Sequence, residues 1–136
     1  MEKEYEVYSF YGENDVFRIF NGVIVIAPEE EIFDGGILEI KEDDLKISSY
    51  LVTFYIMSGN DKSVVMSNAI HDMTGGAVNM EGDLGKMSGK DFIVKKTYNG
   101  WDENLYCEMI ITNLSGEQKE YQIPLELRKI TASEGR

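Results

Sequence analysis

The sequence predicts an all-β protein, a single antiparallel β-sandwich of about nine strands over residues 1–136. Apolar and polar residues alternate along residues 120–128, as in a half-buried strand. Extended segments recur about every eight to twelve residues, with turn residues between them. No stretch of about ten residues combines helical spacing with helix caps. A closed up-and-down barrel of the lipocalin type is the alternative, because hairpin-by-hairpin order suits both folds.

The first strand is expected at residues 5–11, where acidic and aromatic side chains alternate before a turn-like Gly-Glu-Asn-Asp stretch. A hairpin is expected next, formed by residues 16–20 and 23–27. Its turn would be Asn21-Gly22, because both central residues of a type I′ turn need a positive φ and Asn-Gly is the dipeptide that best supplies it. Three glutamates and Pro28 then end the hairpin.

A short strand is expected at residues 37–41, followed by a hairpin of residues 48–57 and 63–70. Residues 48–57 are rich in β-branched and aromatic side chains, and both faces of the strand are largely apolar. A strand of this kind is central and covered on both sides, or it belongs to a contact surface.

The glycine-rich segment 71–90 is expected to be an irregular loop, with at most a short strand at residues 77–80. Extended structure resumes at residues 92–98, and residues 105–130 form the final hairpin. Pro124 lies inside this hairpin and lacks a backbone donor, which indicates an edge strand.

The composition is strongly acidic, with 13 basic and 25 acidic residues and a net charge of −12. This balance argues against nucleic acid and against an anionic membrane surface as partners. Most of the acidic excess lies in residues 1–45, in runs that are typical of solvated turns.

Direct membrane insertion is not expected, since no apolar run approaches the ~20 residues of a membrane span. The first residues lack the order of a signal peptide. The one cysteine, Cys107, lies in an apolar alternation and is expected to be a core residue. We therefore expect a soluble chain, extracytoplasmic if a targeting segment has been trimmed and otherwise cytoplasmic.

No catalytic, cofactor or metal site is expected from the titratable residues. His71 is the only histidine, which argues against a catalytic triad and a conventional zinc site. Methionines recur every seven residues from Met66 to Met87, but the glycines between them prevent the helix that would gather their sulfurs. Neighbouring carboxylates such as Asp43-Asp44 and Asp102-Glu103 are read as turn residues.

The function that these patterns favour is non-enzymatic binding of a protein or a small ligand, as the soluble part of an envelope or secreted protein. The candidate binding surface consists of Tyr98 and Trp101, in or beside a predicted turn, together with Tyr55 and Met57. If the second face of residues 48–57 is uncovered, the chain is expected to form a homo-oligomer or to bind a partner there.

Two other functions stay open. A barrel that carries a small apolar ligand would need an internal pocket lined by residues such as Phe54, Tyr55 and Tyr106. A hydrolase would need two carboxyl groups roughly 5 to 10 Å apart in one cleft. In each case we expect the site near the glycine-rich loop or the turn that holds Trp101, rather than in residues 105–130.

Overall fold

The fold is described from a computed structural model of the chain. It describes residues 6–27, 29–42, 46–71, 82–90, 93 and 103–130. Within these ranges there is no α-helix. The strands are β1 (Glu6–Glu13), β2 (Phe17–Ile26), β3 (Glu31–Asp34), β4 (Ile37–Ile40), β5 (Ile47–Ser58), β6 (Asp61–His71), β7 (Gly82–Asp83), β8 (Lys86–Gly89), β9 (Leu105–Asn113), β10 (Gln118–Pro124) and β11 (Glu126–Lys129).

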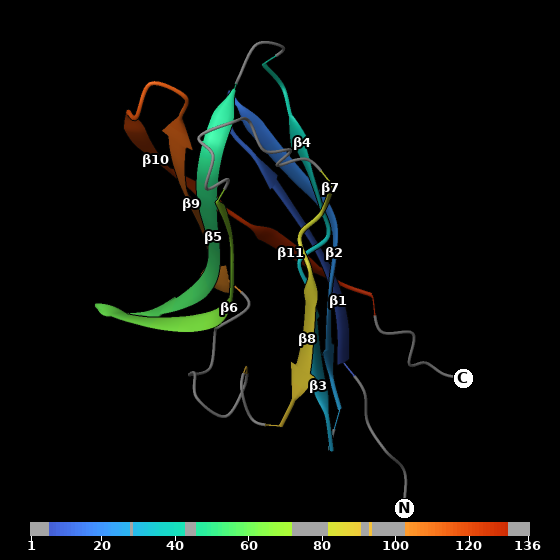
Figure 1. The fold of residues 1–136 in the computed structure, drawn as a ribbon. Coiled ribbons are helices and arrows are strands. Elements are labelled where there is room, and N and C mark those ends of the chain that lie inside the picture. The colour runs from blue at the N-terminus through green and yellow to red at the C-terminus, as the bar shows by residue number, and fades with distance from the viewer. Residues whose placement is uncertain are drawn as a thin grey trace, which may run out of the picture.

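Two antiparallel sheets form the molecule (Figure 1). The larger has seven strands, in the order β11-β1-β2-β3-β8, with β4 paired to β2 and β7 paired to β4. The smaller has four, in the order β10-β9-β5-β6. The sheets do not close on each other, so the predicted β-sandwich is confirmed and the barrel alternative is wrong.

The core lies between the sheets and is centred on three phenylalanines, two from the larger sheet and one from the smaller. The ring of Phe33 lies 5.4 Å from that of Phe10 and 4.9 Å from that of Phe54, measured between centroids. All three side chains are buried. Each such side chain stabilises the fold by roughly 1.5–3 kcal/mol through its burial, so this cluster holds the two sheets together.

The predicted hairpin at Asn21-Gly22 is wrong, because residues 17–26 form the single strand β2 (Figure 1). Asn21 has a φ of 61°, as the dipeptide predicts, but Gly22 does not have a positive φ. A type I′ turn needs a positive φ at both residues. One residue in that conformation produces a local irregularity of the strand instead of a reversal.

That irregularity is a β-bulge between β1 and β2. Phe10 pairs with Gly22 and Gly12 pairs with Ile19, so β2 has one residue more than β1 between these two pairs. The partner on the other side of β2 changes at the same place, from β4 before the bulge to β3 after it. The bulge therefore marks the point where the larger sheet divides.

The second predicted hairpin is confirmed as β5 and β6. The final hairpin, predicted over residues 105–130, is confirmed for β9 and β10 but not for residues 126–129, which form β11 in the other sheet. β5 pairs on both sides, with β6 and with β9, as its two apolar faces predicted. β10 is an edge strand, as Pro124 predicted. After β10 the chain crosses to the larger sheet, where β11 pairs with β1.

Three short strands were not predicted. β3 lies in the stretch that we read as the acidic end of a hairpin, and β7 and β8 lie in the segment that we read as a loop. Strands this short depend on pairing with a neighbour, here β3 with β8 and β4 with β7, more than on their own sequence. The strands predicted at residues 77–80 and 92–98 lie outside the described residues, apart from the buried Ile93.

Candidate functional site

Two of the four residues predicted to form a binding surface, Tyr98 and Trp101, lie outside the described residues. The other two are on β5. Tyr55 is only 1% exposed, and Met57 is half-buried. The structure therefore corrects the prediction for Tyr55, whose ring is not available on an open surface.

The environment of Tyr55 explains its burial. Its ring stacks on that of Tyr106 with 5.6 Å between centroids, and the Lys62 ammonium lies 4.4 Å from its centroid. The side-chain amide of Gln122 donates a hydrogen bond to its hydroxyl. Side chains from the neighbouring strands thus cover the ring within the outer layer of the smaller sheet.

The residues considered for catalysis do not form a catalytic group where the structure describes them. Cys107 is buried, and burial raises the pKa of its thiol above the ordinary value. The side chain of His71 is outside the description, as are Asp43, Asp44 and Asp102. Among the described side chains, no group of three or more His, Cys, Asp or Glu could hold a metal ion.

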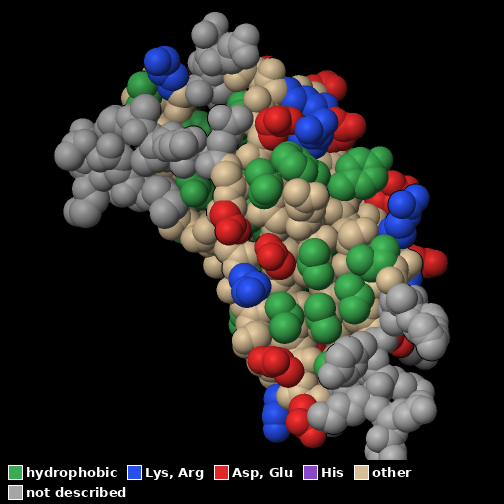
Figure 2. Space-filling model, turned by 90° about the vertical axis from the view of Figure 1, so that its right-hand side faces the viewer, with side chains coloured by type: hydrophobic (Ala, Val, Ile, Leu, Met, Phe, Trp, Pro, Cys, Tyr) green, Lys and Arg blue, Asp and Glu red, His purple; other side chains and the backbone are tan. Residues whose placement is uncertain are grey.

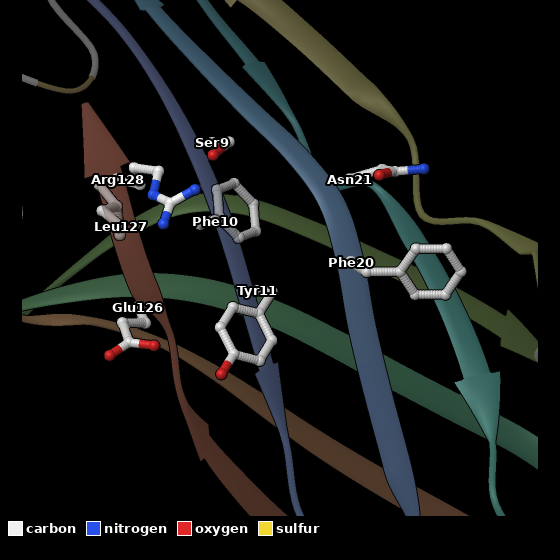
Figure 3. A pocket seen from close by; sticks show the side chains of 8 residues that line it. All are labelled: Ser9, Phe10, Tyr11, Phe20, Asn21, Glu126, Leu127 and Arg128. Carbon is white, nitrogen blue, oxygen red and sulfur yellow. The ribbon is translucent and has the colours of Figure 1, made fainter. Parts of the chain in front are cut away.

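The candidate site is a depression of about 590 Å³ on the larger sheet, in the region where β11, β1 and β2 lie side by side. Three strands contribute its lining, which consists of Ser9, Phe10, Tyr11, Phe20, Asn21, Glu126, Leu127 and Arg128. Figure 3 shows Tyr11 between Glu126 on one side and Phe20 on the other, with the Arg128 side chain extending from β11 toward β1. Asn21, the residue of the bulge with positive φ, lies on the β2 side.

Several side chains of the depression are available to a ligand. Tyr11 is 49% exposed. The side chains of Tyr11, Asn21, Glu126 and Arg128 make no hydrogen bond or ion pair with any other described residue. Together they offer an exposed ring, a donor-only guanidinium, an acceptor-only carboxylate and an amide that does both.

The bulge positions these groups. Tyr11 is the single residue of β1 between the pairs Phe10–Gly22 and Gly12–Ile19. It therefore lies opposite two residues of β2, Phe20 and Asn21, one of which is the additional residue of the bulge. On the other side, Tyr11 pairs directly with Glu126. Residues at unusual backbone angles are enriched at functional sites, so Asn21 in the lining is a second reason to consider this depression.

A second depression, of about 350 Å³, adjoins the first and shares Tyr11 and Glu126 with it. Its other lining residues are Gly12, Glu13, Pro124 and Leu125. The two depressions meet at these shared residues of β1 and β11, and together we call them the β1–β11 groove. Gly12 allows the strands to approach closely, because a Cβ at this position would lie 2.6 Å from the Pro124 carbonyl oxygen.

Ion pairs flank the groove. Glu13 lies 2.6 Å from the Lys41 Nζ, and the hydrogen bond from this ammonium lowers the pKa of the Glu13 carboxyl. The Arg18 guanidinium lies 4.9 Å from the centroid of the Phe20 ring and pairs with Glu39 at 3.0 Å. One ring of the groove is thus already occupied by a cation, whereas no cation is found over Tyr11 among the described residues.

The outer face of the larger sheet also carries apolar side chains. The register places Val7, Val23, Val25 and Ile32 on one face, and all four are half-buried. Figure 2 shows hydrophobic side chains gathered over this face, with charged ones along its margins. The β1–β11 groove opens on the same face, since Tyr11 follows Val7 and Ser9 in the alternation of β1.

Comparison with known proteins adds no relative. No family model, no curated protein and no solved structure matches the chain. No helix in the described part of the chain is long and apolar enough to cross a membrane. The case for a function therefore depends on the groove itself.

Sequence reasoning placed the site elsewhere and missed this groove. The signals were present in two stretches interpreted in other ways. The Asn21-Gly22 dipeptide is typical of a turn, and the alternation along residues 120–128 is typical of a hairpin strand, so neither pattern indicates a binding site by itself. Their juxtaposition depends on β11 leaving the smaller sheet and pairing with β1, which no local pattern shows.

Proposed function

We propose that this chain is a non-enzymatic β-sandwich domain that binds a ligand in the β1–β11 groove. The observation that carries the proposal is the convergence, in one depression, of an exposed tyrosine with Asn21, Glu126 and Arg128, whose side chains make no hydrogen bond or ion pair within the described part of the chain. Pockets that combine an apolar surface with a few converging polar groups are the usual sites of ligand binding.

One carboxylate of the groove does not suit the acid step of hydrolysis. Two carboxylates line the second depression, Glu13 and Glu126. A glycoside hydrolase needs one carboxyl group that stays protonated and acts as an acid, which requires a raised pKa. The pKa of Glu13 is shifted in the opposite direction by Lys41, so Glu13 does not fit that role.

A binding role is compatible with either compartment that we considered. The chain has a single cysteine and it is buried, so no disulfide forms within the chain. The stability of the fold therefore does not depend on whether the compartment is oxidising or reducing. Nucleic acid is a poor candidate ligand, because the net charge of −12 repels phosphates at long range.

The test is a chemically unbiased fragment screen followed by two-dimensional 15N NMR. We expect the fragments that bind to shift the amide signals of residues 9–11, 20–22 and 126–128. Tyr11→Ala should abolish these shifts, because it removes the exposed ring from the centre of the groove.

Val64→Ala is the matched control, since Val64 is 55% exposed but belongs to β6 of the other sheet. This variant should bind the same fragments as the parent chain. Fragments that shift signals only on the smaller sheet, or a screen without binders, would refute the proposal.

A further inference from the structure

We infer that the ligand of the β1–β11 groove is a neutral oligosaccharide, with one sugar ring on Tyr11 and its hydroxyl groups bonded by Arg128, Glu126 and Asn21. This inference depends on the proposed function and adds the chemical class of the ligand. It follows from the donors and acceptors in the groove, their charge, the exposed ring and the two adjoining depressions.

The polar groups of the groove match a ligand that donates and accepts hydrogen bonds at closely spaced positions. Arg128 can only donate and Glu126 can only accept, whereas Asn21 and Ser9 can do both. A hydroxyl group also does both, and neighbouring hydroxyls of a sugar can face a guanidinium and a carboxylate at once. A ligand that could only donate hydrogen bonds would leave Arg128 without a partner, and one that could only accept them would leave Glu126 without a partner.

Tyr11 supplies the apolar part of such a site. Its ring is about half exposed, and Phe20 beside it is covered on one side by Arg18. The face of an aromatic ring carries a partial negative charge and attracts weakly positive hydrogens. One face of a pyranose presents C–H groups, so a sugar can stack on Tyr11 while its edge hydroxyls reach the polar groups.

Charge favours a neutral ligand over an acidic one. The charges of Arg128 and Glu126 offset each other in the lining of the first depression. Beyond it, the chain carries a net charge of −12, which lowers the encounter rate and affinity of anions such as uronic acids or sulfated sugars.

An extended peptide fits the groove less well. β1 pairs with β2 and β11, and β2 pairs with β1 and with β3 or β4, so these two strands already use their main-chain groups in the sheet. β11 is the edge strand beside the groove, but a peptide that paired with that edge would extend the sheet in its own plane and would not fill the depression on its face. Within the depression a peptide would be limited to side-chain contacts.

The presence of two adjoining depressions is the reason for proposing more than one sugar unit. The two depressions share Tyr11 and Glu126, which places the stacking residue between two adjoining spaces of about 590 and 350 Å³. A chain of sugars can occupy both, whereas a single sugar fills one. Affinity should therefore rise with chain length up to the number of units that the groove accommodates.

The experiment uses the full chain on a glycan microarray with neutral and acidic glycans, followed by NMR titration with di- and tetrasaccharides of the neutral sugars that bind. We expect the tetrasaccharide to bind at least about tenfold more tightly than the disaccharide, with shifts at residues 9–11, 20–22 and 126–128. Hexalysine serves as a control for non-specific attraction to the acidic chain, which salt should abolish.

Three variants resolve the contributions. Tyr11→Ala should lose about tenfold in affinity, since the stacking ring is removed. Arg128→Lys should lose about tenfold, because an ammonium cannot reproduce the planar fork of donors. Lys119→Ala, an exposed change on β10 of the other sheet, should bind as the parent does and controls for altering a basic side chain away from the groove.

The outcomes separate this inference from the function on which it depends. Fragments that bind the groove without binding of any neutral oligosaccharide would overturn the inference and leave the proposed function intact. Failure of both screens would overturn both. Binding of acidic glycans or hexalysine alone, or neutral glycans at another surface, would also overturn the inference.

Discussion

Phe10 and Gly22 form a cross-strand pair that shapes both the core and the groove. They lie opposite each other on β1 and β2, and a Cβ built on Gly22 would lie 2.3 Å from atoms of the Phe10 ring. Phe10 therefore occupies the space that any other residue at position 22 would need for its side chain. This glycine is required by close approach and not by a turn.

Gly22→Ala should destabilise the fold by about 1–3 kcal/mol, since the added methyl group would lie 2.3 Å from the ring of the buried Phe10 and the ring would have to shift. The measurement is urea unfolding followed by circular dichroism. Asn21→Gly is the matched control, because glycine tolerates the positive φ of 61° at that position. Equal unfolding midpoints for Gly22→Ala and the parent would contradict the argument.

Cys107 gives a prediction about reactivity. Burial raises the pKa of its thiol, so the thiolate that reacts with disulfide reagents is almost absent in the folded protein at pH 8. We expect no reaction with a chromogenic disulfide reagent in buffer and one equivalent of reaction in concentrated guanidinium chloride. Rapid labelling of the folded chain would show that the thiol is accessible. Its place in the core was predicted from the alternation and is confirmed.

Tyr55 shows the limit of prediction for single residues. Its alternation with core residues placed it correctly on the outer face of β5. Its burial depends on Tyr106, Lys62 and Gln122, which approach it from three other strands. Sequence alternation assigns a face of a strand, but it does not reveal how neighbouring side chains cover that face.

Among the elements, strands with a strong local pattern were predicted, and strands that depend on a neighbour were not. The hairpins β5–β6 and β9–β10 have the alternation and turn residues that define them locally. β3, β7 and β8 are short and were missed. Residues 17–26 were predicted to be two strands joined by a turn, and they form the single strand β2. The prediction failed because Asn21 favours a positive φ in a turn and in a β-bulge alike.

Gly12 gives a prediction about β11. A Cβ at this position would lie 2.6 Å from the Pro124 carbonyl oxygen and 2.8 Å from the Leu125 side chain. Gly12→Ala should therefore displace the crossing from β10 to β11 and destabilise the fold by about 1–3 kcal/mol. Hydrogen exchange should accelerate most at the amides of residues 126–129.

Ser9→Ala on the same strand is the control, since Ser9 lies on the outer face and its removal creates no clash. Its exchange rates in β11 should match those of the parent chain. Uniform acceleration in all strands of the Gly12→Ala variant would indicate global destabilisation without a specific effect on β11.

At the scale of the whole molecule, composition and periodicity were enough to predict an all-β fold and to favour the sandwich, with a closed barrel as the alternative. They could not predict which surface carries the candidate site. The groove combines residues 9–13, 20–21 and 124–128, and only the sheet order places them together. Such long-range pairing is encoded by core packing between the sheets, where Phe10, Phe33 and Phe54 meet.

The net charge of −12 gives a prediction for the molecule as a whole. Mutual repulsion of the acidic residues disfavours the compact state, and added salt screens it. We expect the Tm at pH 7 to rise when NaCl is increased from low to moderate concentration. KCl should give the same rise, because the effect depends on ionic strength and not on the identity of the cation. A lower Tm in salt would mean that screened ion pairs outweigh the repulsion.

β11 has a mechanical consequence. It has four register pairs with β1, it is an edge strand, and it carries Glu126 and Arg128 of the groove. Tension on the chain beyond Lys129 would break the β1–β11 hydrogen bonds one pair after another, starting at Lys129. The packing between the two sheets would bear the force only after these bonds had broken. A pulling force of this kind would take apart one wall of the groove while the sandwich stayed folded, so the proposed site should be lost at a lower force than the fold.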